Sequence, residues 1–138
     1  MIEVYSETDL YNIIKHDPRI IIIMFEADYC TSCNLLKPKL MDLEKRYSNK
    51  LLLISINANR ANFILQRYFV DQLPTIIFYQ NQYQFKQYRL VGPTLDTIET
   101  VVNIILTRYS KKVNNLKAVK PTNPEDIYTL QDRLNRWK

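Results

Sequence analysis

Two uninterrupted apolar runs constrain the fold of this chain more than any other feature. They read RIIIIMFEA at residues 19–27 and KLLLISINA at residues 50–58. A strand with one face in water alternates apolar and polar residues, whereas a strand buried on both faces is apolar throughout. A helical pattern from about Cys30 to Tyr47 separates the two runs and is long enough to cross from one parallel strand to the next. The runs therefore predict a parallel strand pair with helices on both faces.

The remaining segments fit the same architecture. Ser6 can cap a helix that ends at Asp17-Pro18, and Thr94 can cap a helix that runs to Leu106. Asn81-Gln82 is expected to form a turn between two antiparallel strands. The further strands are expected at 2–5, 73–79 and 83–91, and the further helix at 60–70. This β-α-β-α-β-α-β-β-α order predicts an α/β sandwich with a mixed sheet.

Length and composition limit the class of protein. A chain of 138 residues fits one domain with a short remainder. The N-terminus has no basic, apolar leader, and the longest apolar run, Ile20 to Phe25, is too short to span a bilayer. We therefore expect a cytoplasmic protein with no membrane partner. The abundance of Ile, Asn, Lys and Tyr, whose codons are rich in A and T, suggests a parasite, a low-GC bacterium or a large DNA virus. A viral source would place the protein in the host cytoplasm or the virion.

The charge is unevenly distributed along the chain. Residues 1–106 hold eleven Lys or Arg and eleven Asp or Glu, so the excess of +5 lies in residues 108–120, which carry no acid. The sequence therefore predicts a domain at 1–107, a basic linker at 108–122 and a C-terminal amphipathic helix at 123–138. Because aromatic residues do not interleave with most of the basic ones, we expect a solvated linker rather than a nucleic-acid partner.

Cys30 and Cys33, the only cysteines, sit two residues apart in ADYCTSCNLLKP. With His16 they supply three potential ligands, one short of a structural zinc site, although a metal shared across a dimer is not excluded. A disulfide closing so small a loop adds little stability. The pair follows a buried strand and opens a helix, where backbone N–H groups and the helix dipole favour a thiolate. The third interpretation, a reactive pair with Cys30 as nucleophile and Cys33 as resolving thiol, is therefore favoured.

A wider set of residues resembles the thioredoxin family. A buried strand ends in MFEADYCTSC, Pro38 follows five residues after the second cysteine, LPT begins at Leu73, and Gly92 follows a strand. The resemblance covers roughly residues 1–107. It implies the thioredoxin fold, a central mixed sheet with helices on both faces, and the same roles for Cys30 and Cys33. It also implies a cis bond between Leu73 and Pro74, and a substrate groove with a rim formed by Tyr29, Leu73, Pro74, Val91, Gly92 and Pro93.

The sequence departs from the family at two places. Thr31-Ser32 stands where typical thioredoxins have Gly-Pro, and both hydroxyls can donate hydrogen bonds near the sulfurs. The family's buried acid falls on Met24, and the lysine that often partners it falls on Ser55. Glu26 is a candidate replacement, because a period of two places it on the same strand face as Met24. The alternative is that Glu26 simply reaches solvent at the strand end.

We predict a thiol–disulfide oxidoreductase that reduces protein disulfides through the CTSC dithiol, with catalytic residues Cys30, Cys33 and Glu26. No metal or organic cofactor is expected. By family resemblance the electrons come from a flavin-dependent thioredoxin reductase or another thiol donor. Two alternatives remain open: a disulfide oxidase or isomerase, and a thioredoxin-fold binding or adaptor module with weak redox activity.

Overall fold

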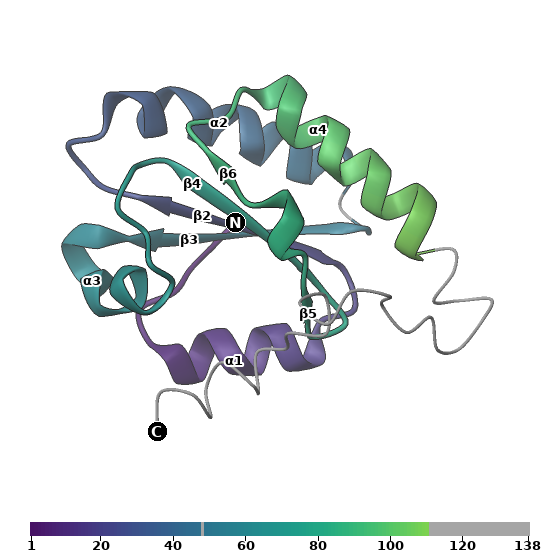
Figure 1. Cartoon of the computed structure of the whole chain (residues 1–138), viewed down its shortest axis with the longest axis horizontal. Helices are drawn as coiled ribbons and strands as arrows, with labels where there is room; N and C mark the ends of the chain where they lie inside the picture. Colours follow the sequence, from purple (N-terminus) through teal and green to yellow (C-terminus); the bar gives the residue numbers. More distant parts are fainter. Residues whose placement is uncertain (48, 111–138) are drawn as a thin grey trace.

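The centre of the molecule is a pair of parallel strands, β2 (Ile20–Glu26) and β3 (Leu51–Asn57), in which every residue is buried. A computed structural model describes residues 1–47 and 49–110. The short strand β1 (Ile2–Glu3) runs parallel to β3 at one edge. On the other side β4 (Thr75–Gln80) pairs antiparallel with β2, so the sheet is mixed. The strands β5 (Tyr83–Gln84) and β6 (Leu90–Val91) both pair with β4. The order β1-β3-β2-β4-β5, with β6 also on β4, confirms the predicted fold class (Figure 1).

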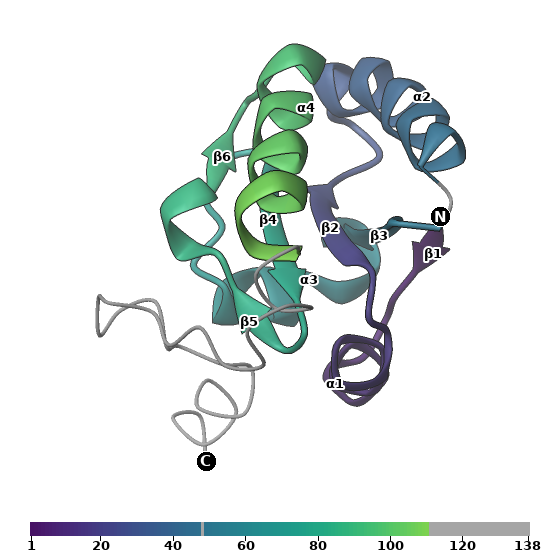
Figure 2. The same ribbon diagram turned by 90° about the vertical axis from the view of Figure 1, so that its right-hand side faces the viewer.

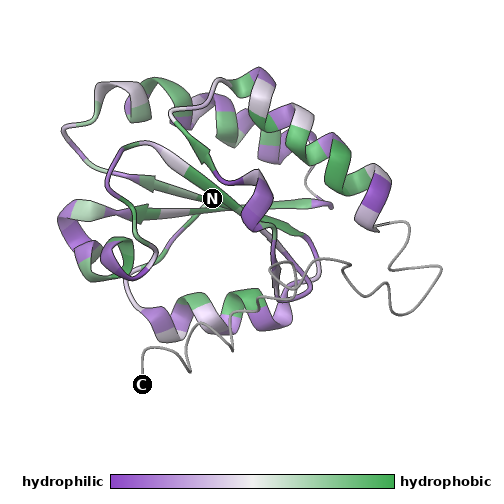
Figure 3. Ribbon diagram, viewed as in Figure 1, coloured by the Kyte–Doolittle hydropathy of each residue, from purple (hydrophilic) through white to green (hydrophobic). Residues whose placement is uncertain are grey.

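Helices cover both faces of this sheet. α1 (Glu7–His16) and α3 (Ala58–Arg67) lie on one face, and α2 (Thr31–Arg46) and α4 (Leu95–Ile104) lie on the other (Figure 2). Successive side chains of β2 serve the two cores in turn. The core under α2 and α4 contains Ile20, Ile22 and Met24, and the core under α1 and α3 contains Ile21, Ile23 and Phe25. This double burial explains why the strand sequences are apolar except at Glu26, Ser55 and Asn57, and the hydropathy colouring shows both strands as largely green (Figure 3).

The helix starts follow the expected capping chemistry. The hydroxyl of Ser6 accepts a hydrogen bond from the backbone N–H of Asp9 at 3.1 Å, and the hydroxyl of Thr94 accepts one from Thr97 at 3.3 Å. Each bond satisfies a donor that has no partner within its helix. Within the described residues, no helix has both the length and the apolar character needed to cross a bilayer.

The prediction of one strand over residues 83–91 is wrong. The segment forms β5 (Tyr83–Gln84), a 3₁₀ turn (Lys86–Tyr88) and β6 (Leu90–Val91). Both strands pair with β4, but their registers differ: Tyr79 faces Gln84, whereas Thr75 faces Val91. The register shifts by three residues between these pairings, and the three residues of the turn take up the extra length.

The last described helix extends beyond the domain boundary that the sequence predicts. α4 continues as a π-helical segment, Ile105–Ser110, so the first three residues of the predicted 108–122 linker are helical. Within it Ile105 is buried, and the ring of Tyr109 packs edge-on against Phe85 with centroids 4.9 Å apart. The rest of the predicted linker and the predicted helix at 123–138 lie outside the described residues.

Two truncations test where the folded unit ends. A chain ending after Ser110 should keep disulfide turnover within about threefold of the full chain, because both cores and both cysteines lie upstream. A chain ending after Thr107 loses the contact of Tyr109 with Phe85, and an aromatic pair is worth about 1 kcal/mol. Its melting temperature should therefore be lower by roughly 4–8 °C. Equal melting temperatures for the two truncations would show that Tyr109 adds nothing to the core.

Candidate active site

The first cysteine is built into the start of helix α2. Strand β2 ends at Glu26, a short turn follows, and Cys30 adopts an extended conformation as the N-cap of the helix. Its sulfur accepts a hydrogen bond from the backbone N–H of Cys33 at 3.2 Å. The sulfur thus takes the place of the oxygen that usually caps a helix, next to the positive end of the helix dipole. This position stabilises a thiolate on Cys30 and supports its predicted role as nucleophile.

The two cysteines form a disulfide in the structure, with Cα atoms 5.2 Å apart. They differ in access to solvent, since Cys30 is 9% exposed and Cys33 is 0% exposed. A protein substrate can therefore approach the sulfur of Cys30, while the sulfur of Cys33 lies behind it. This asymmetry agrees with the predicted order of attack, in which Cys30 reacts first and Cys33 resolves the mixed disulfide.

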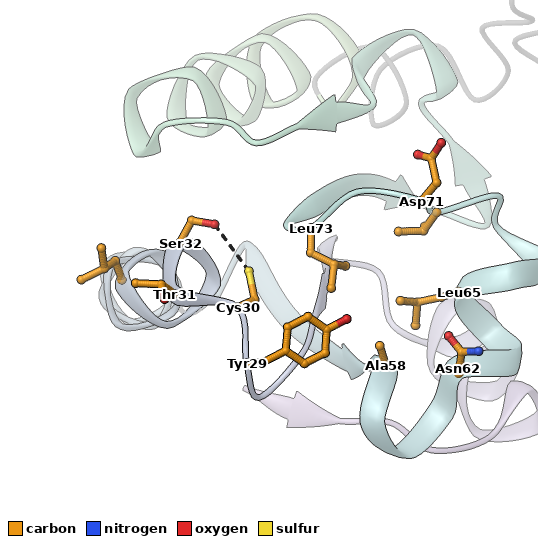
Figure 4. Close-up of a pocket in the computed structure, with 11 residues that line it drawn as sticks. Tyr29, Cys30, Thr31, Ser32, Ala58, Asn62, Leu65, Asp71 and Leu73 are labelled. Carbon is orange, nitrogen blue, oxygen red and sulfur yellow. Dashed lines mark hydrogen bonds between the residues drawn. The ribbon is translucent and has the colours of Figure 1, made fainter.

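The dipeptide between the cysteines adds a second donor near the nucleophile. The hydroxyl of Ser32 lies 3.4 Å from the sulfur of Cys30 (Figure 4). Typical thioredoxins have proline at the position of Ser32. Proline has no hydroxyl and cannot make this contact. A hydroxyl that donates to a thiolate stabilises the charged form, so Ser32 adds to the effect of the helix start.

An open pocket of about 810 Å³ lies beside Cys30. Its walls come from the cysteine loop, from α3 and from the segment that leads to β4, with Tyr29 and Leu73 among the lining residues (Figure 4). Tyr29 is 75% exposed. The structure therefore brings Tyr29 and Leu73, two residues of the predicted groove, together around the reactive sulfur.

The other predicted groove residues lie behind or beside this pocket rather than in its lining. The bond between Leu73 and Pro74 is cis, as predicted, and Pro74 is buried. Its carbonyl accepts a hydrogen bond from the backbone N–H of Gly92 at 2.8 Å, which ties Gly92 to the segment that follows Leu73. Gly92 has a φ of +60°, a left-handed conformation that glycine adopts without strain. Val91 is half exposed and Pro93 is partly exposed.

Glu26 does not reach solvent at the strand end. Its side chain is 3% exposed, and its carboxylate lies 2.8 Å from the ammonium of Lys37 on α2. The hydroxyl of Ser55 on β3 donates a hydrogen bond to the same carboxylate oxygen. Lys37 follows Cys33 by one helical turn, so this ion pair, with a buried carboxylate and a partly exposed ammonium, lies under the same face of α2 as the resolving thiol. Met24, fully buried in the core that also contains Cys33, has no group that titrates.

Lys37 was not predicted as a partner of Glu26. The signal was available, because residues four apart on a helix share a face and Cys33 was already assigned to α2. Ser55 was singled out from the sequence only because the family often has a lysine at that position. The hydrogen bond from Ser55 to Glu26 joins β3 to β2, and no local sequence pattern predicts such a contact.

One comparison decides the family of the chain. The thioredoxin family model matches residues 1–104, about three quarters of the sequence and the whole region that holds the cysteine pair and the cis-proline. The chain belongs to the thioredoxin family.

Individual thioredoxins agree with this assignment. Thioredoxin-T of Drosophila melanogaster is 25% identical over 107 residues, which cover 78% of this chain and 67% of that protein. Thioredoxin 2 of Plasmodium berghei (strain Anka) is 34% identical over 77 residues, 56% of this chain and 49% of that protein. The crystal structure of thioredoxin from Trypanosoma brucei brucei has a TM-score of 0.69 at 18% identity, over 77% of this chain and 90% of that one. The structural similarity to the Trypanosoma protein shows that the two chains share a fold.

In this thioredoxin-family domain a polar network supports the turn before Cys30. The carboxylate of Asp28 accepts a hydrogen bond from the side-chain amide of Asn57 at 2.8 Å and lies 3.3 Å from the guanidinium of Arg60. These contacts lower the pKa of Asp28. The hydrogen bond from Asn57 has the larger effect and the contact with Arg60 adds to it. The backbone N–H of Asp28 donates to Asn59 at 2.7 Å. The network ties the turn to the start of α3, and sequence reasoning did not find it because its members come from separate elements.

The domain is a thiol–disulfide oxidoreductase, because it combines the family's fold with an intact and bonded cysteine pair. Membership of the family implies protein disulfides as substrates and a reductase as partner. Among the described residues, no group of three His, Cys, Asp or Glu side chains could hold a metal ion.

Proposed function

We propose that this protein reduces disulfide bonds in other proteins, with Cys30 as the attacking thiolate. The observation that carries the proposal is the geometry of the pair: Cys30 caps a helix at the edge of an open pocket, and Cys33 is buried behind it. An adaptor needs a surface but does not need a nucleophile placed at a helix start. The proposed setting is a reducing compartment such as the cytoplasm.

The reaction takes place in two exchanges. The Cys30 thiolate attacks one sulfur of the substrate disulfide, forms a mixed disulfide and releases the other substrate sulfur as a thiolate. The Cys33 thiol then loses its proton, attacks the sulfur of Cys30 and releases the second substrate thiolate. The substrate has gained two electrons and the Cys30–Cys33 disulfide has formed. A dithiol donor restores the pair, and we propose a flavin-dependent thioredoxin reductase in that role.

We further propose that Glu26 accepts the proton of Cys33 in the second exchange. Three observations support this assignment: the carboxylate is buried, it lies under the face of α2 that carries Cys33, and Met24 offers no alternative acceptor. The ammonium of Lys37 and the hydroxyl of Ser55 hold the carboxylate in place. The ion pair also compensates for the cost of burying a charge, because each member has a partner.

A disulfide-bonded test protein such as insulin checks the proposed activity. In the presence of dithiothreitol, the protein should accelerate reduction, seen as turbidity, well above dithiothreitol alone. The variant Cys30→Ser is the matched control and should give the rate of dithiothreitol alone. No acceleration by the wild-type protein would favour the adaptor function instead.

The direction of catalysis has its own measurement. A reductase should have a reduction potential below about −200 mV, whereas a strong oxidase such as DsbA lies near −120 mV. Equilibration with glutathione buffers of known ratio, followed by alkylation of free thiols, gives the value. A reduction potential of about −120 mV would contradict the proposed reducing role.

A further inference from the structure

The loop between α3 and β4 contains an aromatic residue in an unfavourable conformation. Phe69 has a φ of +56°, the left-handed region that bulky residues rarely adopt, and it is 64% exposed. Glycine would adopt this backbone without strain. Strained residues of this kind tend to occur at ligand and partner sites, because the fold itself gains little from them.

The backbone around Phe69 is held firmly. The guanidinium of Arg89, at the end of the 3₁₀ turn, donates hydrogen bonds to the carbonyl of Tyr68 at 2.8 Å and to the carbonyl of Phe69 at 2.9 Å. The backbone N–H of Phe69 donates to the carbonyl of Gln66 at 3.1 Å. The backbone of Phe69 is therefore fixed next to the pocket in the sequence, because Val70 and Asp71, the next residues, line the pocket.

Asp71 gives this pocket its charge. It is the only charged residue among those that line the pocket, and it is exposed. It lies at the far end of the pocket from Cys30, and its carboxylate points outward, away from Cys30 and Leu65 (Figure 4). Within the described part of the chain, no cationic group forms an ion pair with it. Leu65, Val70 and Leu73 supply apolar surface between the edge and the reactive sulfur.

An apolar wall that ends in a carboxylate, with exposed aromatic residues beside it, suits a long cationic side chain. The methylene groups of lysine or arginine pack on apolar surface while the charged head reaches polar groups. A carboxylate pairs with that head, and an aromatic face attracts it. Residues 1–106 carry equal numbers of acidic and basic side chains, so a preference for cations would come from this site rather than from overall charge.

We propose that the pocket beside Cys30 selects protein disulfides that have a lysine or arginine next to the reacting cysteine, with Asp71 and Phe69 as specificity-determining residues. The inference rests on the proposed reductase function and names its substrate class. The cationic side chain lies along Leu65, Val70 and Leu73, with its head at Asp71. Because the site is exposed, the expected preference is moderate, about three- to fivefold in kcat/KM.

Two synthetic disulfide peptides test the proposal on the full-length protein. They are identical except for arginine or glutamate beside the cysteine, and each is reduced under the same thiol donor. The wild-type protein should reduce the arginine peptide about three- to fivefold faster in kcat/KM. Asp71→Asn should bring the ratio to about one, and Asp71→Lys should reverse it. Asp42→Asn, which removes an exposed carboxylate of α2 away from the pocket, is the matched control and should leave the ratio unchanged.

Variants of Phe69 provide a second test, because Phe69→Gly should change the melting temperature and the arginine preference in opposite directions. Phe69→Gly should raise the melting temperature by a few degrees, because glycine relieves the left-handed strain, yet it should lower the arginine preference by about twofold. Phe69→Tyr should retain the preference. An unchanged ratio in Asp71→Asn, or equal rates for both peptides with the wild-type protein, overturns the proposal. If the wild-type protein reduces neither peptide, the proposed reductase function fails with it.

The basic segment at residues 108–120 is the alternative occupant of this site. A full-length variant in which Lys111, Lys112, Lys117 and Lys120 are glutamine separates the two cases. An arginine preference that stays within about twofold of the wild-type value supports the substrate as occupant. A rise of the preference well above the wild-type value would also support the substrate as occupant, and would show that the chain's own segment competes with it for Asp71. A fall of the ratio to about one would overturn the assignment to substrate.

Discussion

Replacing Cys30 with serine is expected to reduce disulfide turnover at least about a thousandfold, while replacing Cys33 with serine is expected to trap the protein on its substrates. A serine hydroxyl is not ionised at neutral pH, so Cys30→Ser lacks the attacking group. Cys33→Ser keeps the thiolate at the helix start but has no thiol to resolve the mixed disulfide. Non-reducing electrophoresis should show adducts of Cys33→Ser and none of Cys30→Ser.

The same two variants assign the reactivity of each thiol. In the reduced protein at pH 7, the single thiol of Cys33→Ser should react with iodoacetamide faster than the single thiol of Cys30→Ser. The reason is that Cys30 is at the surface of the pocket and Cys33 is buried. The double variant controls for background labelling. Equal rates, or faster reaction of Cys33, would contradict the assignment of nucleophile and resolving thiol.

The trapped adducts would also give direct evidence on the substrate proposal. Proteins that form mixed disulfides with Cys33→Ser can be identified, and the residues next to their target cysteines can be read. Enrichment of lysine and arginine at those positions agrees with selection by Asp71. Because the adduct forms before Cys33 acts, this comparison does not depend on the resolving step.

The sequence was sufficient for the central sheet because burial leaves a clear local signal. Strands β2 and β3 contribute to both cores, so apart from Glu26, Ser55 and Asn57 their residues are apolar without alternation, and the pattern alone places them. The caps at Ser6 and Thr94 also depend on neighbours only three residues away. The two central strands and the helix caps were therefore predictable, because each depends on residues within one strand or one helix.

The interruption of residues 83–91 depended on contacts that the local pattern does not contain. Phe85 is buried against Tyr109, which lies 24 positions later, and β5 and β6 pair with β4 in registers that differ by three residues. An alternating sequence fits one continuous strand equally well. The site shows the same limit: Cys30 and Cys33 were found from their spacing, whereas the partners of Glu26 come from α2 and β3.

Replacing Glu26 with glutamine is expected to slow release of the mixed disulfide by at least about tenfold, while the first attack by Cys30 stays nearly unchanged. Glutamine has nearly the shape of glutamate but accepts no proton at neutral pH, and general-base assistance is worth about 10²–10⁴-fold. Attack by Cys30 uses a thiolate stabilised at the helix start, which does not involve Glu26. Rapid-mixing kinetics with a fluorescent disulfide substrate separates the two steps.

Ser55→Ala is the matched control for this variant. It removes the hydroxyl that donates to the carboxylate but leaves the carboxylate and Lys37 in place, so release should slow by less than about threefold. Equal effects of Ser55→Ala and Glu26→Gln would mean that the cluster matters for packing alone. Release by Glu26→Gln should also accelerate more steeply as the pH rises, because hydroxide and solvent must then remove the proton. An unchanged release rate would reject the assignment of Glu26 as proton acceptor.

Met24→Asp then tests the place where the family usually has its acid. Met24 is fully buried in the core that contains Cys33, so an aspartate there adds a second carboxyl group on the same side of the sheet. In the Glu26→Gln background it should restore fast release at neutral pH. The buried carboxyl group should also lower the free energy of unfolding by about 1–3 kcal/mol, which thermal unfolding measures. A folded double variant that releases as slowly as Glu26→Gln alone would show that a carboxylate at position 24 cannot serve this resolving thiol. The proton path would then depend on the position of Glu26 beside Lys37 and not on a buried acid in general.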